Sequence, residues 1–189
     1  NANFYSGRKK TLFSIVRYGN VLGSRGSIIP FLQSNKNSKS IPITHPKMSR
    51  FLVKLKDAVD LVAFASKKMI GGEIFVLKCP SVMIVDLAKA IIPSAPIKYI
   101  GIRPGEKIDE MMISLDESRR SREFKNHYII YSDDIYKKIN KKDINNIGKK
   151  LNDNFTYSSL NNSNWLSGNS LKAFISEISW FHILNNQLI

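Results

Sequence analysis

Residues 17–31 read RYGNVLGSRGSIIPF, a stretch that follows the apolar run LFSIV at 12–16 and ends in the apolar run IIPF at 28–31. It carries three glycines and two arginines. Glycine lets a backbone turn tightly and approach a neighbour closely. Arginine presents a planar fork of N–H groups that matches phosphate oxygens. The stretch therefore indicates a short buried strand followed by a loop that comes close to something negatively charged.

Outward from this loop, short strands alternate with helices, which predicts a fold of the α/β or α+β class. The predicted strands are 12–16, 41–44, 51–53, 73–77, 98–102 and 128–131. The predicted helices are 27–33, 55–69, 81–91 and 170–178, with a turn at 103–105 that leads into a further helix before 114. Residues 140–154 are low in complexity and are expected to form a loop.

The composition is that of an ordinary globular chain, and 189 residues are enough to bury a core. No apolar run approaches the roughly 20 residues that cross a bilayer, and the first residues do not resemble a signal peptide. The only cysteine, Cys79, is expected to be a buried thiol. The three histidines have no metal-binding spacing, so we expect no metal, and we expect a cytoplasmic protein.

The net charge of +14 raises the alternative of a basic module that binds nucleic acid. Its basic clusters are not interleaved with aromatic residues, and no helix-turn-helix or similar signature occurs. A solvated basic surface is therefore the preferred interpretation, and we expect no nucleic-acid partner.

Four arginines lie at strand ends or turns, where functional side chains usually occur: Arg17, Arg25, Arg50 and Arg103. Several arginines that converge from separate loops would hold a diphosphate. Glu106 follows Arg103 in a turn made tight by proline and glycine, and its carboxylate can accept hydrogen bonds from sugar or ribose hydroxyls, or hold Arg103. Each arginine could instead be a solvated surface residue or form a structural salt bridge. Glu106 could instead be an acid at a helix N-terminus, where the helix dipole favours it.

Five blocks of sequence carry a resemblance to a known family. They are FSIVRYGNVLGSRGSIIPF, ITHPKMSRF, GGEIFV, IGIRPGEKIDEMMIS and FTYSSLNNSNWL, in this order. Together they resemble the C-terminal portion of the inverting UDP-N-acetylglucosamine 4,6-dehydratases. These enzymes belong to the capsule-type, polysaccharide-biosynthesis branch of the extended short-chain dehydrogenase/reductase superfamily.

The resemblance implies the C-terminal part of an extended Rossmann-type fold with a mixed α/β substrate-binding subdomain. Residues 1–135 would hold both, and 136–189 would be a Lys/Asn-rich loop with a helical extension. The N-terminal half that binds NADP would be absent. So would the family's glycine fingerprint and its catalytic Tyr/Lys pair, which the resemblance places upstream of residue 1. No catalytic residue is therefore assigned, and we expect this chain to be inactive alone.

The resemblance also implies roles for residues of this chain. Arg50 and Arg103 match the arginines that hold the diphosphate, and Glu106 matches the acid on the ribose or uracil side. Asn20 matches an asparagine that touches the substrate, and Val21 matches a neighbour of the nicotinamide. Thr44 lies on the segment that lines the nucleotide, and Arg25 is a further substrate-binding candidate.

The activity implied is the conversion of a UDP-sugar, UDP-N-acetylglucosamine, to a 4-keto-6-deoxy sugar nucleotide with inversion at C5, by a homo-oligomer. Such products feed capsule, lipopolysaccharide or flagellin glycans. A UDP-sugar 4-epimerase or a retaining 4,6-dehydratase of the same superfamily remains an alternative, because arginines on a diphosphate do not distinguish these reactions.

Overall fold

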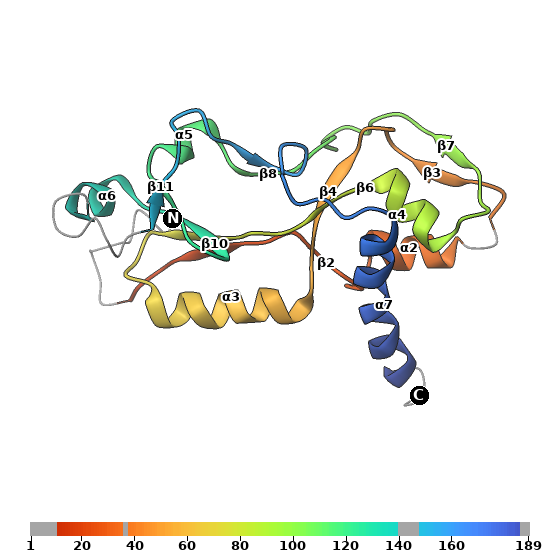
Figure 1. Ribbon diagram of the computed structural model, residues 1–189, viewed down its shortest axis with the longest axis horizontal. Helices are drawn as coiled ribbons and strands as arrows, with labels where there is room; N and C mark the ends of the chain where they lie inside the picture. The colour runs from red at the N-terminus through yellow and green to blue at the C-terminus, as the bar shows by residue number, and fades with distance from the viewer. Residues whose placement is uncertain (1–10, 36–37, 140–147, 186–189) are drawn as a thin grey trace. The chain divides into compact units, whose positions relative to one another are not determined.

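The computed structural model describes residues 11–35, 38–139 and 148–185 (Figure 1). The chain folds into two compact units. Unit 1 comprises Asn1–Tyr18, Leu55–Lys78 and Met111–Ser158. Unit 2 comprises Gly19–Lys54, Cys79–Glu110 and Ser159–Ile189. Both units mix helices with strands, which confirms the predicted α/β class, whereas the expected boundary after residue 135 stays a prediction.

Unit 1 is built on a mixed sheet of five strands. These are β1 (Ile15–Arg17), β5 (Ile74–Leu77), β10 (His127–Ile130), β9 (Ser121–Glu123) and β11 (Lys149–Lys150), in that spatial order. β1 runs parallel to β5, and the remaining neighbours are antiparallel. The strands predicted at 73–77 and 128–131 are confirmed, with ends that differ by one residue.

Helix α3 (Leu55–Lys68) lies along this sheet and contacts β1 and β5 (Figure 1). It confirms the helix predicted from the apolar spacing of 55–69. The buried side is formed by Ala58, Leu61 and Ala65, which recur every three to four residues. Leu55, Val59 and Val62, which contributed to the same helical spacing, are instead about half exposed.

β1 differs from the prediction of a buried strand at 12–16. The strand begins at Ile15, and Leu12, Phe13 and Ile15 are each more than 40% exposed. Within the described residues β1 forms one edge of the sheet and pairs with β5. An apolar run at a sheet edge is covered on fewer sides than one in a central strand, which accounts for the difference.

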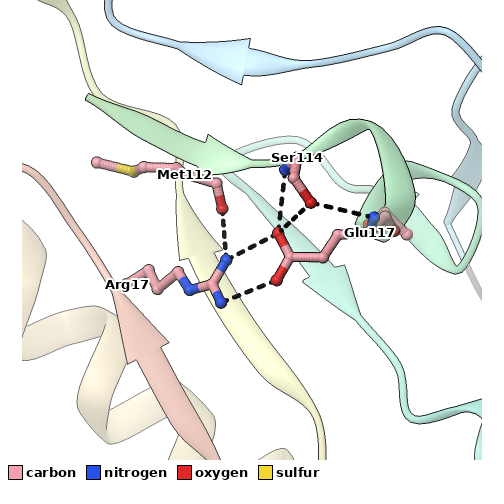
Figure 2. Close-up of polar contacts among 5 residues, drawn as sticks. Arg17, Met112, Ser114 and Glu117 are labelled. Atoms are coloured by element: carbon pink, nitrogen blue, oxygen red, sulfur yellow. Dashed lines mark hydrogen bonds and ion pairs between the residues drawn. The ribbon is translucent and has the colours of Figure 1, made fainter. Parts of the chain in front are cut away.

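Arg17 ends β1 and is held by a bidentate ion pair with Glu117 (Figure 2). The two pairs of atoms lie 3.0 and 2.9 Å apart, and Nη1 also donates to the Met112 carbonyl at 2.8 Å. Glu117 at the same time forms a capping box with Ser114 at the start of helix α5 (Leu115–Ser118). Arg17 is therefore a structural arginine of unit 1, the alternative that its sequence position left open.

Unit 2 contains two small sheets. In the first, β2 (Asn20–Val21) runs parallel to β4 (Ser49–Val53), and β4 runs antiparallel to β6 (Ser81–Met83). In the second, β3 (Ile41–Ile43) runs parallel to β7 (Ile97–Tyr99). The strands predicted around 41–44, 51–53 and 98–102 are confirmed with shifted ends.

Three helices complete unit 2: α2 (Ile28–Ser34), α4 (Ile84–Ile91) and α7 (Gly168–Asn185). α4 contacts α2, α7 and β3 (Figure 1). Their shared core includes Leu32, Ile41, Leu52, Leu87 and Leu171, all at most 1% exposed. Cys79 is 1% exposed, which confirms the buried thiol. No helix among the described residues is long and apolar enough to cross a membrane.

Two helix predictions are wrong, one at its N-terminal end and the other over its whole length. Residues 81–83, predicted to open a helix, form β6, and α4 begins only at Ile84. The helix predicted between the turn at 103–105 and residue 114 is a bend followed by the strand β8 (Met111–Ile113). β6 pairs with β4, and β8 pairs with β12 (Tyr157–Ser158). These distant partners override the local helical preference.

Gly19, which immediately precedes β2, lies against the backbone of β4. A Cβ atom at this position would come within 2.6 Å of Phe51 Cβ and 2.7 Å of the Phe51 carbonyl oxygen. Such distances are too short for any side chain. The glycine therefore allows β2 to pair with β4 and brings Asn20 beside Phe51.

Replacing Gly19 with alanine should lower the free energy of unfolding by about 2 kcal/mol, because the methyl group must displace the Phe51 backbone. Gly26→Ala is the control, since a Cβ there meets nothing within 4 Å although φ is +71°. It should cost only the backbone strain of about 1 kcal/mol. Urea unfolding of both variants measures this, and a smaller loss for Gly19→Ala than for Gly26→Ala would contradict the packing argument.

Replacing Arg17 with lysine should lower the free energy of unfolding by about 1 kcal/mol, because an ammonium group cannot make the bidentate contact at this partly exposed site. The same variant should leave the affinity for UDP unchanged. Thermal unfolding together with calorimetric titration of UDP measures both effects. A loss of UDP affinity without a loss of stability would return Arg17 to the ligand site.

Candidate functional site

The candidate site lies in unit 2, at the carboxyl ends of the parallel strands β3 and β7. Thr44 follows β3 directly, and the loop 100–106 follows β7. The Ile100 N–H donates to the Ile43 carbonyl at 3.0 Å, so the two strand ends stay together. Ligands of α/β proteins commonly bind at the carboxyl ends of parallel strands.

Thr44 and Glu106 meet across these two strand ends. The Thr44 hydroxyl donates to Oε1 of Glu106 at 2.8 Å. The Arg103 N–H donates to Oε2 at 3.2 Å, and the Glu106 N–H donates to the Arg103 carbonyl at 3.0 Å. Thr44 is 9% exposed, whereas Arg103 is exposed. The turn therefore holds the Glu106 carboxylate and leaves the Arg103 guanidinium in solvent.

The surroundings of Glu106 favour its charged form. The hydrogen bond from Thr44 lowers the pKa of Glu106 most strongly, and partial burial opposes this by raising it. The bond from the Arg103 N–H and the positive charges of Arg103 and Arg50 lower the pKa further. Arg103 and Arg50 thus act on the same carboxylate, from the loop after β7 and from β4.

Arg50 is held more firmly than Arg103. Its Nη1 donates to the Ser49 and Ile108 carbonyls at 2.7 and 3.1 Å, and its Nη2 donates to the Lys107 carbonyl at 2.8 Å. Its Nε lies 3.6 Å from Oε1 of Glu110. Only 16% of its side chain is exposed. Much of the hydrogen-bonding capacity of Arg50 therefore fastens the 107–110 segment onto β4.

Glu110 is a residue of the site that the sequence reasoning missed. The pKa of Glu110 is raised above its ordinary value, because burial outweighs the opposing effects. The charge of Arg50, a hydrogen bond from the Phe51 N–H and the charge of Lys107 lower this pKa. Its backbone N–H donates to the Ser159 hydroxyl at 2.9 Å, and the Ser159 N–H donates to its carbonyl at 2.8 Å. Asp109 and Glu110 are adjacent carboxylates, so the sequence does not show which of them belongs to the site. The contacts of Glu110 with Arg50 and Ser159, which are distant in sequence, identify it.

Asn20 joins Glu110 from β2. With the amide nitrogen directed inward, Nδ2 lies 3.2 Å from the Phe51 carbonyl oxygen and 3.3 Å from Oε2 of Glu110. The neighbouring Val21 is partly exposed. Asn20 and Val21 thus stand next to β4, the strand that carries Arg50.

Arg25 is not drawn into this arrangement. It lies in the turn between β2 and α2 with an exposed side chain. No hydrogen bond or ion pair among the described residues connects it to Glu106 or Glu110. The structure therefore brings together Thr44, Arg103 and Glu106 as one group, and Asn20, Arg50 and Glu110 as a neighbouring group.

The site combines the exposed guanidinium of Arg103 with two hydrogen-bond acceptors, the charged carboxylate of Glu106 and the side-chain amide of Asn20. Such a set binds an anion through Arg103 and hydroxyl or N–H donors through Glu106 and Asn20. No group of three or more histidine, cysteine, aspartate or glutamate side chains in the described part of the chain is placed to hold a metal ion.

A family of polysaccharide biosynthesis proteins matches residues 1–132 of the chain. The chain belongs to this family. The blocks of sequence that carry Asn20, Thr44, Arg50, Arg103 and Glu106 all lie within the matched residues. The family resemblance seen in the sequence is thereby confirmed.

Named members extend the comparison. A UDP-N-acetylglucosamine 4,6-dehydratase (inverting) from Campylobacter jejuni is 44% identical over 186 residues, which cover 95% of this chain and 56% of that protein. A UDP-glucose 4-epimerase from Rickettsia bellii is 44% identical over 131 residues, covering 67% of this chain and 38% of that protein. The chain thus spans about half the length, or less, of the curated relatives it matches.

A solved structure supports the fold of this family member. The X-ray structure of Pen from Bacillus thuringiensis superposes with a TM-score of 0.75 at 33% identity. The match covers 92% of this chain and 52% of that one. The expected fold, the C-terminal part of a Rossmann-type protein of the α/β class, is confirmed at this level.

One Tyr-x-x-x-Lys spacing does occur in the chain, from Tyr5 to Lys9. The sequence reasoning overlooked it when it placed the family's Tyr/Lys pair upstream of residue 1. Both residues lie outside the described part of the chain. No catalytic role is assigned to them, and the upstream position of the family's pair stays a prediction.

Replacing Thr44 with valine should raise the pKa of Glu106 toward its ordinary value of 4.5, because the strongest hydrogen bond to the carboxylate is lost. In the wild type the depressed pKa stabilises the fold above pH 4.5, and this stabilisation disappears as the pH falls through the lower value. NMR titration of the Glu106 side-chain carbon in both proteins measures the shift. An identical midpoint in wild type and variant would remove Thr44 as its cause.

Proposed function

We propose that this chain is the substrate-binding half of a nucleotide-sugar dehydratase. The substrate would be UDP-N-acetylglucosamine, and the product a UDP-4-keto-6-deoxy-hexosamine inverted at C5. The 44% identity to the Campylobacter jejuni dehydratase over 95% of the chain supports this choice of reaction. The family description supports a place in the biosynthesis of surface polysaccharides or glycans, of which capsule and flagellin glycans are the instances that we propose.

One observation in the structure carries the proposal. Thr44 and Glu106 are bonded at the carboxyl ends of β3 and β7, Arg103 donates its backbone N–H to the same carboxylate, and Arg50 donates to the carbonyl of the next residue, Lys107. Two arginines on the segments that flank one fixed carboxylate suit a ligand that carries both a diphosphate and ribose or uracil donors.

The roles of the residues follow from what each still offers to a ligand. Arg103, exposed and charged, would bind the diphosphate, and Arg50 would add its charge from β4. Glu106, ionised and held by Thr44, would accept hydrogen bonds from ribose hydroxyls or the uracil N–H. Arg25 would approach the ligand from the turn after β2. These contacts bind and orient the substrate, and they transfer no proton.

NADP is the cofactor that we propose for the whole protein. Val21, which is apolar and partly exposed on β2, is the residue of this chain that we propose to contact its nicotinamide ring. When bound, NADP would supply hydride transfer. The residues of this chain would keep the sugar in place beside it. A homo-oligomer is part of the same proposal.

The epimerase alternative has its own support in the Rickettsia bellii relative, which is equally identical over 67% of this chain. The product separates the two reactions. UDP-N-acetylglucosamine incubated with the complete protein, which under this proposal includes the NADP-binding half, should give a 4-keto-6-deoxy product in the NMR spectrum. A product that differs only in its C4 configuration would establish the epimerase, and no conversion despite tight UDP binding would leave only a binding module.

Replacing Arg103 with alanine should weaken UDP binding about 10-fold or more, because a charge-assisted contact with the diphosphate is lost. Arg119→Ala is the matched control, an exposed arginine of unit 1 whose removal should leave the affinity unchanged. Calorimetric titration with UDP at fixed salt concentration measures both. Equal affinities in the two variants would show that Arg103 does not bind the diphosphate.

A further inference from the structure

Four segments of unit 1 meet at the turn that joins β9 to β10: helix α3, the end of β5, the turn itself and the start of β11. The Phe124 N–H donates to the His127 carbonyl at 2.9 Å and closes the turn. The Lys78 N–H, directly after β5, donates to the Asn126 carbonyl at 3.1 Å. The turn is therefore fixed against the end of β5, and the side chains that it carries have defined neighbours.

These side chains form a chain of ring contacts that joins the turn to α3. The His127 imidazole lies parallel to the Phe124 ring, with centroids 4.9 Å apart and planes inclined by 8°. It also meets the Phe64 ring of α3 at 4.7 Å and 54°. Phe64 in turn contacts the buried Phe75 ring of β5 edge-on at 6.0 Å. Of these four rings only the imidazole can take up a proton.

The start of β11 rests on the Phe124 ring. A Cβ atom at Gly148, directly before β11, would come within 2.8 Å of two atoms of this ring and 2.7 Å of the Glu123 carbonyl oxygen. The glycine thus lets the backbone lie against the ring. Lys149 then pairs with Glu123 in the antiparallel register of β11 and β9. A displacement of the Phe124 ring would remove the surface on which this backbone lies.

The imidazole is placed for its neutral form. Its Nε2 atom is buried and has no hydrogen-bond partner among the residues that the structure describes. A neutral imidazole can leave one of its nitrogens without a hydrogen, whereas an imidazolium carries an N–H group on both. Protonation of His127 would therefore place an unpaired N–H group, and a positive charge, in a buried position.

The charged groups around the imidazole do not compensate for such a charge. Those nearest to these rings along the chain, on α3, after β5, at the turn and on β11, are Asp60, Lys67, Lys68, Lys78, Glu123, Lys125 and Lys149. Both carboxylates are already paired, Glu123 with Lys78 at 2.8 Å and Asp60 with Lys56 at 2.5 Å. The five other groups are lysines, so the surroundings of His127 carry an excess of positive charge.

We propose that His127 is an acid-sensitive switch of unit 1, which holds α3, the turn and β11 together only while its imidazole is neutral. On protonation by solvent the imidazolium leaves its place between the rings for water, and the contact between Phe124 and His127 separates. The start of β11 then loses its support at Gly148. Deprotonation restores the contacts, and the switch does not depend on the proposed function, since unit 2 takes no part in it.

The direction of the pH dependence follows from two opposing effects. A parallel aromatic ring stabilises a cation. Burial, and next the charge of Lys78, lower the pKa of His127 below its ordinary value of 6.5. In the closed form the imidazole therefore holds its proton less tightly than in the open form. The contribution of the switch to stability is complete above pH 6.5 and is lost as the pH falls from there through the lower value.

The experiment measures amide hydrogen exchange of the whole chain by NMR at about pH 7.5 and about pH 5, on either side of the range in which histidine titrates. The reporters are the N–H groups of Phe124 and Lys78, which close the turn and tie it to β5. After correction for the intrinsic effect of pH on exchange, the open fraction should rise about 5-fold or more in acid. That factor is the lower end of the cost of one unpaired buried donor.

Two variants and one control assign the effect to His127. His127→Phe keeps a ring in the stack and cannot be protonated, so the turn should stay closed in acid. Lys78→Met removes the nearby charge and frees Glu123 to pair with the imidazolium, so the pKa of His127 should rise and the opening in acid should decrease. His45→Phe changes a histidine of unit 2 and should keep the response of the wild type.

Three results would overturn the switch. An equal acid response in the wild type and in His127→Phe would show that another group opens the turn. A midpoint of the His127 ring signals above pH 6.5 would show that the rings favour the imidazolium. Titration of His127 without any change in exchange would show that the stack holds in both charge states. UDP binding by unit 2 is measured separately, so the proposed function stands or fails independently of these results.

Discussion

The contact between Gly19 and the Phe51 backbone is the constraint on which the site of unit 2 depends. Because no Cβ intervenes, β2 pairs in parallel with β4, and Asn20 follows at a fixed distance from the Phe51 carbonyl. β4 in turn carries Arg50, whose guanidinium fastens the 107–110 segment. One close approach of two backbones therefore places the amide of Asn20, the guanidinium of Arg50 and the carboxylate of Glu110 together.

The arginines of this strongly basic chain serve different purposes according to their partners. Both Nη atoms of Arg17 donate to the Glu117 carboxylate. Arg50 donates to backbone carbonyls and forms an ion pair with Glu110. Desolvating an arginine without such partners would be costly, so the two arginines with less exposure are also the two with more contacts. Arg103 shows the opposite combination of high exposure and few partners, which leaves its charge for a ligand.

Binding and chemistry are separated along the chain under the function that we propose. Unit 2 gathers the groups that hold a nucleotide sugar, whereas the residues expected to move hydride and protons are not among those of the site. The chain spans about half the length, or less, of its curated relatives. Under this proposal, substrate binding lies in the half that this chain covers. A site of this kind can select its sugar through residues that never touch the reacting atoms.

The sequence by itself determined the α/β class and the family, because the alternation of elements and the order of motifs are read directly along the chain. The roles of Thr44, Arg103 and Glu106 at a ligand stay predictions, although the structure brings these residues together. The sequence also predicted the helix at 55–69, whose apolar spacing is local too. Only the tertiary structure decided that 81–83 and 111–113 are strands, since β4 and β12, their partners, lie far away in the chain. It alone separated Arg17 from Arg50 and revealed Glu110, because the partner that neutralises or orients a charged group is found through folding, not through sequence order.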